Sequence, residues 1–328
     1  MLGILSILVT GGAGFIGSHT VRLLRALGRE VIVLDSLERG QGKSLLGAEL
    51  IVGSISDESL IEKTCRQHDV SAILHFAAYK SVSESMSSPG LYWQNNVAGT
   101  VHLAEGALAA GVQHMVFSSS ASVYGNPEAT PITESAEIRP ENVYAESKAT
   151  MERVLSWFGE THGLRSVSLR YFNAAGASLD GVIGENWSAT TNLVPLVMKA
   201  VLGVSGPVQV FGNDYPTPDG TGIRDYIHVE DLARAHVAAL DYLAADGDST
   251  AVNLGTGVGS SVLDILHRTA VEAGREVPHD IVARRVGDPA VVFADPSAAE
   301  RVLGWTSTLT LDDIIQSAYA WHASQVSN

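Results

Sequence analysis

The chain has 328 residues, 45% hydrophobic and 17% charged, which is the composition of a compact globular protein and excludes a disordered one. Its net charge of -15 at pH 7 argues against general binding to nucleic acid or to anionic membrane surfaces. A single cysteine, Cys65, excludes an internal disulfide and gives no sign of a zinc cluster, so we expect a reducing, cytoplasmic setting and no bound metal.

The chain opens with the apolar run M-L-G-I-L-S-I-L-V-T, which leads directly into a glycine turn at Thr10–Gly11. The run lacks a basic start and a small-residue cleavage site, so it predicts a buried strand and not a signal peptide. No stretch approaches the ~18 apolar residues of a membrane helix, and we therefore expect no membrane segment.

Six short apolar runs share one pattern, since they are rich in β-branched residues, do not alternate with polar ones, and are followed by turns and stretches with helical spacing. Such runs are typical of strands buried on both faces of a parallel sheet. Their alternation with helices predicts an α/β fold with a Rossmann-type, doubly wound parallel sheet. The runs are Ile4–Val9, Val31–Leu34, Leu50–Val52, Ala72–Phe76, Met115–Phe117 and Val167–Leu169.

The sequence pattern changes after Asn173, where the apolar runs become shorter and less regular and are interrupted by glycine and proline. We predict a sheet domain over residues 1–173. Residues 174–328 are expected to form mainly a smaller C-terminal lobe that completes a cleft, with some segments returning to the sheet domain.

The segment T-G-G-A-G-F-I-G, from Thr10 to Gly17, lies between the first predicted strand and a predicted helix. Gly11, Gly14 and Gly17 fit the pattern G-x-x-G-x-x-G. The glycines let the backbone turn tightly and approach a pyrophosphate, which the N-terminus of the helix then binds. In this strand–turn–helix context the segment predicts a dinucleotide-binding turn.

Asp35 ends the second predicted strand, 18 residues beyond Gly17. Its carboxylate is suited to accept both hydroxyls of an adenosine ribose and would repel a 2′-phosphate. NAD is therefore predicted as the cofactor in preference to NADP.

Tyr144 and Lys148 stand four residues apart in a stretch with helical spacing, so they share one helix face. An ammonium group there favours the phenolate and would lower the tyrosine pKa from about 10, which suits a general base acting on a sugar or alcohol hydroxyl. Taken alone, the pair fits a solvated helix face equally well.

The segment F-S-S-S-A-S-V-Y-G, from Phe117 to Gly125, directly follows an apolar run. It places hydroxyl groups at the C-terminal edge of the predicted sheet, where ligands of such folds bind. Read alone, it is equally consistent with a polar transition from strand to loop.

Together these motifs resemble the extended short-chain dehydrogenase/reductases, and over essentially the whole chain the sequence is similar to the UDP-glucose 4-epimerase family. The most specific matching segments are R-Y-F-N at 170–173 and F-G-N-D-Y at 211–215. The resemblance implies an NAD-dependent isomerase that inverts C4 of a UDP-hexose through a transient 4-keto sugar. It also implies a homodimer, an NAD-binding domain over residues 1–173 and a UDP-sugar-binding lobe over residues 174–328.

The resemblance further assigns roles to individual residues. Tyr144 would remove the proton of the 4′-hydroxyl, Lys148 would bind the nicotinamide ribose, and Ser120 would hydrogen-bond the 4′-oxygen. The cofactor would contact Gly11, Gly14, Phe15, Ile16, Gly17, Asp35, Ser36, Ser54, Ile55, Phe76, Ala77, Ala78, Lys80, Asn95, Ser118, Tyr144, Lys148 and Phe172. The UDP-sugar would contact Lys80, Ser120, Tyr144, Asn173, Asn192, Leu193, Gln209, Phe211, Arg224, Arg285, Asp288 and Val292.

Arg224 and Arg285 also make physical sense without the resemblance, because a guanidinium suits a pyrophosphate in an otherwise acidic protein. Without it, two structural arginines in ion pairs would be the better interpretation.

Two departures from the family pattern bear on affinity and substrate choice. Ser54 stands where the family usually has Asp, so the site lacks a carboxylate for the adenine amino group. Val292 stands where some relatives carry Tyr, and the smaller side chain enlarges the sugar pocket; Ser81 and Ser83 are further candidates to face the sugar. UDP-glucose and UDP-galactose are the expected substrates, with UDP-GlcNAc, UDP-GalNAc or UDP-glucuronate as alternatives.

Two other functions fit the same fold. A nucleotide-sugar 4,6-dehydratase needs an additional acid and base and carries Thr-Asp-Glu where this chain has Ser120-Ala121-Ser122. A non-catalytic NAD sensor would characteristically lack Tyr144 or Lys148. Epimerisation is therefore the favoured prediction. His75, His228 and His236 lie in apolar stretches and are expected to be hydrogen-bonded core or near-surface residues and not metal ligands.

Overall fold

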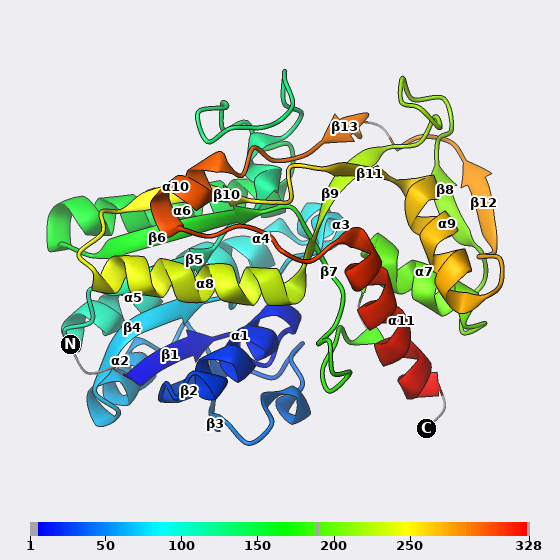
Figure 1. The fold of residues 1–328 in the computed structure, drawn as a ribbon. Coiled ribbons are helices and arrows are strands. Elements are labelled where there is room, and N and C mark those ends of the chain that lie inside the picture. The colour runs from blue at the N-terminus through cyan, green and yellow to red at the C-terminus, as the bar shows by residue number, and fades with distance from the viewer. Residues whose placement is uncertain (1–5, 188–189, 286, 327–328) are drawn as a thin grey trace.

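A seven-stranded parallel sheet forms the centre of the larger part of the computed structural model, which describes residues 6–187, 190–285 and 287–326 (Figure 1). The strand order is β10-β6-β5-β4-β1-β2-β3. The strands are β1 (Ser6–Thr10), β2 (Val31–Asp35), β3 (Glu49–Val52), β4 (Val70–His75), β5 (His114–Ser118), β6 (Arg165–Tyr171) and β10 (Thr250–Leu254). All six predicted strands are present; Ile4 and Leu5 of the first lie outside the described residues.

Strand β10 is the strand that the sequence-based prediction lacked. It pairs in parallel with β6, with Thr250 opposite Val167 and Leu254 opposite Tyr171. The sheet is therefore not built from the first 173 residues alone, because one edge strand comes from much later in the chain.

Alternate residues of the central strands enter two apolar clusters, one on each face of the sheet. Val9 and Val33 pack with residues of α1 (Phe15–Ala26) and α8 (Val229–Ala244). Leu8 and Ile32 pack on the opposite face, which is covered by α2 (Glu58–Gln67), α5 (Gly99–Ala109) and α6 (Val143–His162) (Figure 1). Burial on both faces explains why the strands are continuous apolar runs, and it confirms the doubly wound sheet.

The smaller part of the molecule has its own sheets and apolar cluster, on the right of Figure 1. Strand β9 (Ile223–His228) pairs with β7 (Asn173–Ala175), β11 (Gly259–Ser261) and β13 (Val291–Val292), and β8 (Val208–Phe211) pairs with β12 (His279–Val282). Helices α7 (Leu193–Val201), α9 (Val262–Ala273) and α11 (Leu311–Val326) share the cluster. The sequence change after Asn173 thus coincides with the start of this architecture.

The remaining helices are short and connect the main elements. They are α3 (Val82–Ser87), α4 (Pro89–Tyr92), α10 (Ser297–Leu303), the 3-10 helices η1 (Gly42–Leu45) and η3 (Ala121–Tyr124), and the π-helix η2 (Trp93–Ala98). Within the described residues, none of the helices combines the length and apolar character needed to span a bilayer.

Candidate active site

The glycine turn between β1 and α1 has the geometry that the sequence predicts. Gly11 has a φ of +72°, and a Cβ there would lie 2.5 Å from the backbone nitrogen of Ala77. A Cβ on Gly17 would lie 2.4 Å from the carbonyl oxygen of Gly11. Helix α1 begins at Phe15 with Gly14 as its N-cap, and no side chain caps its N-terminus among the described residues. The backbone therefore offers N–H groups at a cradle that side chains would fill, which fits a pyrophosphate.

Asp35 braces this turn from the end of β2. Its Oδ2 accepts a hydrogen bond of 3.0 Å from the backbone of Ala13, and its Oδ1 accepts one of 2.8 Å from the backbone of Leu37. Ser36 follows directly. A carboxylate offers about four lone-pair positions, so Asp35 retains capacity for both ribose hydroxyls.

The segment predicted to face the adenine differs in burial from one residue to the next. Ser54 is exposed, and its hydroxyl accepts a 3.1 Å hydrogen bond from the backbone of Ser56. Ile55 is buried beside Gly99, where a Cβ would come within 2.7 Å of its Cδ1. Ile55 thus provides an apolar wall, and Ser54 provides one exposed hydroxyl.

Phe76, Ala77 and Ala78 follow β4 and are half-buried, with the Phe76 ring 4.5 Å from that of His236. Lys80, two residues further, directs its ammonium group to the carboxylate of Glu185 at 3.4 Å. Glu185 is nearly buried, and sequence reasoning missed it because the segment around it carries no recognisable motif.

Asn95 in the π-helix donates a 3.0 Å hydrogen bond to the side chain of Asn96. Asn96, which sequence reasoning also missed, is fully buried and bonds both backbone groups of Tyr79 and the hydroxyl of Ser147. It therefore ties the loop after β4 to α6, between Tyr144 and Lys148. The doubled Asn in N-N-V-A-G-T was the only local signal for it.

Tyr144 lies in the first turn of α6, which is capped by the Asn142 side chain through a 2.9 Å hydrogen bond to the backbone of Ala145. The backbone nitrogen of Tyr144 donates to the buried hydroxyl of Ser85 at 3.1 Å. One turn later, the Nζ of Lys148 donates to the carbonyl oxygen of Ser118 at 2.7 Å. The structure therefore brings the predicted Tyr and Lys to the end of β5, where the serines lie.

The electrostatics of the pair differ from the expectation. Burial raises the pKa of the Tyr144 phenol, and a hydrogen bond with the Ser120 side chain lowers it. Burial lowers the pKa of Lys148 to about 7, while the negative charge of Glu152 raises it. The pKa of Tyr144 is thus raised where the sequence predicted that Lys148 would lower it, because burial disfavours the charged forms of both groups and the lowering contribution comes from Ser120.

The serine segment places its three side chains in different directions. Ser120 accepts hydrogen bonds from the backbone nitrogen (3.1 Å) and hydroxyl (2.9 Å) of Ser122. The hydroxyls of Ser118 and Tyr171 lie 2.6 Å apart. Ser119 is fully buried and donates its hydroxyl to Glu152 of α6. Of the three, Ser120 is therefore placed to act together with Tyr144.

Cationic and aromatic residues predicted for the nucleotide half lie in the smaller part of the molecule. The guanidinium of Arg285 lies 3.8 Å above the centre of the Phe211 ring; Phe211 is the last residue of β8, and Arg285 follows the end of β12. Arg224 pairs with Asp288 at 2.5 Å. Two residues N-terminal to Phe211, Gln209 is exposed on β8.

Asn173 and Asn192 are held by hydrogen bonds in the structure. The Asn173 side chain donates to the backbone oxygen of Asp225 at 2.9 Å. Asn192 is the N-cap residue of α7, directly before Leu193, and its side chain donates to Glu185 at 3.2 Å. Glu185 therefore contacts two predicted ligand-binding residues, Lys80 and Asn192.

Val292 lies opposite Arg224 in the β13–β9 pair. It packs on an apolar cluster that contains Tyr124 and, at its edge, Phe172. The cluster joins η3 and α6 to β13, so the predicted substrate residue Val292 and the predicted cofactor residue Phe172 pack against the same group of side chains.

Two of the three histidines noted in the sequence have hydrogen-bond partners in the core on both ring nitrogens. His75 lies between the hydroxyls of Thr10 (2.8 Å) and Thr100 (3.1 Å). His228 caps α8 and bonds Ser317 at 3.1 Å. His236 is fully buried, with one nitrogen 2.8 Å from the Leu232 carbonyl. The prediction that they are core residues is confirmed.

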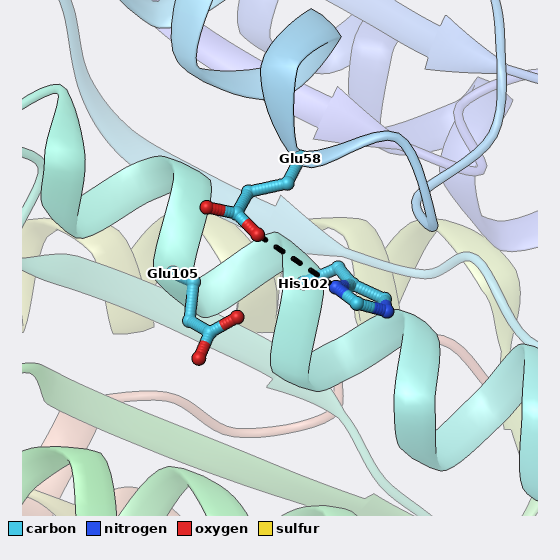
Figure 2. A group of neighbouring side chains, drawn as sticks. All are labelled: Glu58, His102 and Glu105. Carbon is cyan, nitrogen blue, oxygen red and sulfur yellow. Dashed lines mark ion pairs between the residues drawn. The ribbon is translucent and has the colours of Figure 1, made fainter.

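Among the residues that the structure describes, one group of potential metal ligands lies elsewhere, on α2 and α5 (Figure 2). Glu58 pairs with His102 at 3.8 Å, and Glu105 lies one turn further along α5. Glu58 and Glu105 are exposed, so a surface ion pair accounts for the arrangement.

Comparison with known proteins shows which family the chain belongs to. A model of the NAD dependent epimerase/dehydratase family matches residues 7–255. The UDP-glucose 4-epimerase of Streptococcus mutans is 44% identical over 324 residues, covering 98% of this chain and 97% of the relative.

Solved structures agree in fold over nearly the whole chain. The UDP-glucose 4-epimerase from Brucella ovis in complex with NAD has a TM-score of 0.94 at 43% identity, covering 96% of this chain and 97% of that one. The enzyme from Stenotrophomonas maltophila with bound NAD and formylated UDP-arabinopyranose has a TM-score of 0.95 at 40% identity, covering 98% and 99%. The chain therefore belongs to the NAD-dependent epimerase/dehydratase family, among the UDP-glucose 4-epimerases.

Proposed function

We propose that this protein interconverts UDP-glucose and UDP-galactose, with NAD held at the glycine turn. The proposal rests mainly on the meeting of Tyr144, Ser120 and Lys148 at the end of β5, at the same edge of the parallel sheet as the glycine turn that follows β1. A base, a hydroxyl partner and an ammonium group are thereby assembled at the edge where a doubly wound sheet binds its nucleotide.

Each residue has a distinct proposed role. Tyr144 takes the proton of the sugar 4′-hydroxyl as a phenolate. Burial disfavours that form, whereas the hydrogen bond with Ser120 and the positive charges of Lys148 and bound NAD⁺ would favour it. Ser120 also hydrogen-bonds the 4′-oxygen. Lys148 binds the nicotinamide ribose from the interior, where its ammonium is already held by the Ser118 carbonyl. NAD⁺, held at the glycine turn, would supply a reversible hydride acceptor at C4′, so that the sugar can pass through a 4-keto form and regain its hydride on the opposite face. Tyr144 then gives the proton back, so the cycle has no net oxidation.

The UDP half is proposed to bind in the smaller part of the molecule. Arg285 is exposed beside Phe211, and Arg224 lies across a strand pair from Val292, so the two arginines suit the two phosphates. Lys80, Asn173, Asn192, Leu193, Gln209 and Asp288 complete the proposed contact set. The proposed boundary between the cofactor and sugar parts stays at residue 173, with β10 contributed to the sheet from the later part.

The protein is proposed to be a cytoplasmic homodimer. Trp157 is 64% exposed on the outer face of α6, the helix that carries Tyr144. A large exposed aromatic side chain on α6, which packs beside α5, suits a helix-to-helix contact between copies. Sedimentation of wild type and a Trp157→Arg variant tests this, since the variant is expected to be monomeric.

Separate incubation with UDP-glucose, UDP-GlcNAc and UDP-glucuronate tests the function, with each 4-epimer read by NMR. We expect UDP-galactose to form from UDP-glucose. Absence of turnover with all three sugars would rule out the epimerase assignment.

A further inference from the structure

A buried ion pair lies one helical turn beyond Lys148. Glu152 of α6 accepts hydrogen bonds from Arg170 of β6, at 3.0 Å from Nε and 2.6 Å from the terminal nitrogen Nη2. Only 13% of the Glu152 side chain and 9% of the Arg170 side chain are exposed. Arg170 opens the R-Y-F-N segment but has no part in the proposed chemistry, so its role is open.

Glu152 also binds the serine segment. The hydroxyl of the fully buried Ser119 donates to its Oε1 at 2.5 Å. The residues on either side of Ser119 are those that meet the proposed catalytic pair, because the Ser118 carbonyl accepts from Lys148 and the Ser120 side chain bonds Tyr144. One carboxylate therefore holds the middle of the segment on which both contacts depend.

Arg170, the other member of the ion pair, is held by further hydrogen bonds. Arg170 donates to the Tyr124 hydroxyl at 2.8 Å, which donates to the Asn253 side chain at 2.8 Å. Asn253 in turn donates to the backbone of Ile132 at 2.9 Å. Since β6, β10 and η3 all contribute, Glu152 has a fixed frame against which to hold Ser119.

Stability alone does not explain such a pair. Desolvating two charges offsets much of their attraction, and well-packed apolar residues often serve equally well. Apolar residues would neither hold the Ser119 hydroxyl nor place a negative charge beside Lys148. The titratable groups that act on Lys148 or feel its charge are Glu152 on its own helix and His75 on β4. Burial together with Lys148 lowers the pKa of His75 to about 3, so His75 is neutral.

We propose that Glu152 is a positioning residue of this site. Through Ser119 it holds the serine segment against Tyr144 and Lys148, and its charge, oriented by Arg170, keeps the Lys148 ammonium protonated. The identity of the chemical step rests on the proposed function, whereas the positioning itself does not.

Two variants separate the effect of the Ser119–Glu152 hydrogen bond, the tether, from the effect of the Glu152 charge. Ser119→Ala removes the tether and keeps the ion pair, and it should lower kcat by about 10- to 100-fold with KM changed less than about twofold, because small misplacements of reacting groups are costly. Glu152→Gln combined with Arg170→Gln keeps an acceptor for Ser119 and removes both charges without leaving one unpaired. It should lower the pKa of Lys148 by about 1 unit.

The Lys148 pKa is read by lysine-selective NMR titration of the folded, NAD-loaded protein, which has five lysines. Arg165→Gln is the control. It breaks the exposed ion pair between Arg165, on the same strand as Arg170, and Asp246, and it should change neither kcat nor the pKa of Lys148. A Ser119→Ala variant with wild-type kcat, or a double variant with an unchanged Lys148 pKa, would overturn the proposal. Wild-type protein without turnover would instead refute the proposed function, and the NMR comparison would still stand.

Discussion

The Nζ of Lys148 donates a 2.7 Å hydrogen bond to the carbonyl oxygen of Ser118, joining the middle of α6 to the end of β5. This contact places the ammonium group beneath the serine segment and beside the helix turn that carries Tyr144. Burial lowers the pKa of Lys148 to about 7, so its charge depends on the groups around it. The proposed chemistry therefore depends on a buried cation whose surroundings are as important as its spacing from Tyr144.

Gly17→Ala is expected to abolish NAD binding and to destabilise the protein. The new Cβ would lie 2.4 Å from the Gly11 carbonyl and 2.9 Å from the Gly12 Cα, and backbone atoms at this turn cannot move away independently. Bound NAD is measured by its absorbance after denaturation, and unfolding by thermal melting. Gly206→Ala, where a Cβ meets nothing within 4 Å, is the control and should retain full cofactor.

Arg285→Lys should raise the KM for the UDP-sugar about 10- to 100-fold with little change in kcat. The reason is that lysine lacks the planar guanidinium, which can donate two parallel hydrogen bonds to one phosphate. Arg284→Lys is a matched control, since its neighbouring guanidinium stacks on Tyr215 and pairs with the exposed Asp214. Steady-state kinetics of both variants measure the two KM values. Equal effects of the two substitutions would contradict the assignment of Arg285.

Val292→Tyr should narrow the sugar pocket. Val292 packs near Phe172 and Tyr124, so a larger side chain there would extend into the space proposed for the hexose. We expect turnover of UDP-GlcNAc to fall relative to turnover of UDP-glucose. The ratio of kcat/KM for the two sugars checks this, and an unchanged ratio would show that Val292 does not face the 2-substituent.

His322 makes the protein sensitive to acid. Burial, and then the positive charge of Lys199, lower its pKa from 6.5 to about 3. Between these pH values the unfolded chain binds a proton that the folded chain does not, so stability present above pH 6.5 is lost as the pH falls. His322→Phe should keep the stacking on Trp187, at 4.8 Å, and reduce the pH slope of the unfolding free energy by up to ~1.4 kcal/mol per unit.

Urea denaturation at several pH values between about 7 and about 5 measures that slope. The exposed His267→Gln serves as the control and should leave it unchanged. An unaltered slope in His322→Phe would mean that the folded protein already binds the proton at this histidine.

The central sheet was predictable because its strands are buried on both faces and are continuous apolar runs. The T-A-V-N-L of β10 lacked that signal, since it contains Asn253, whose buried amide binds Tyr124 and Ile132. Its place beside β6 depends on the whole intervening chain, which no local pattern encodes.

The candidate site likewise has residues that local motifs predict and residues that only the packing of distant segments brings together. Gly11, Gly17 and Asp35 belong to one local motif, and Tyr144 and Lys148 to another, so spacing was enough to select them. Glu152 and Arg170 look like surface charges in the sequence and are buried only because β6 packs beside α6. The four-residue step from Lys148 to Glu152 was the one local hint, since it extends the same helix face.

The most direct test of the account is to incubate NAD-loaded wild type and Tyr144→Phe with UDP-galactose and to follow the sugar by NMR. The account predicts UDP-glucose from the wild type, with no net change in oxidised cofactor. Tyr144→Phe should retain NAD and be slower by about 10²- to 10⁴-fold, the usual share of general acid–base catalysis. Wild-type rates in Tyr144→Phe, or a released 4-keto-6-deoxy sugar from the wild type, would contradict it.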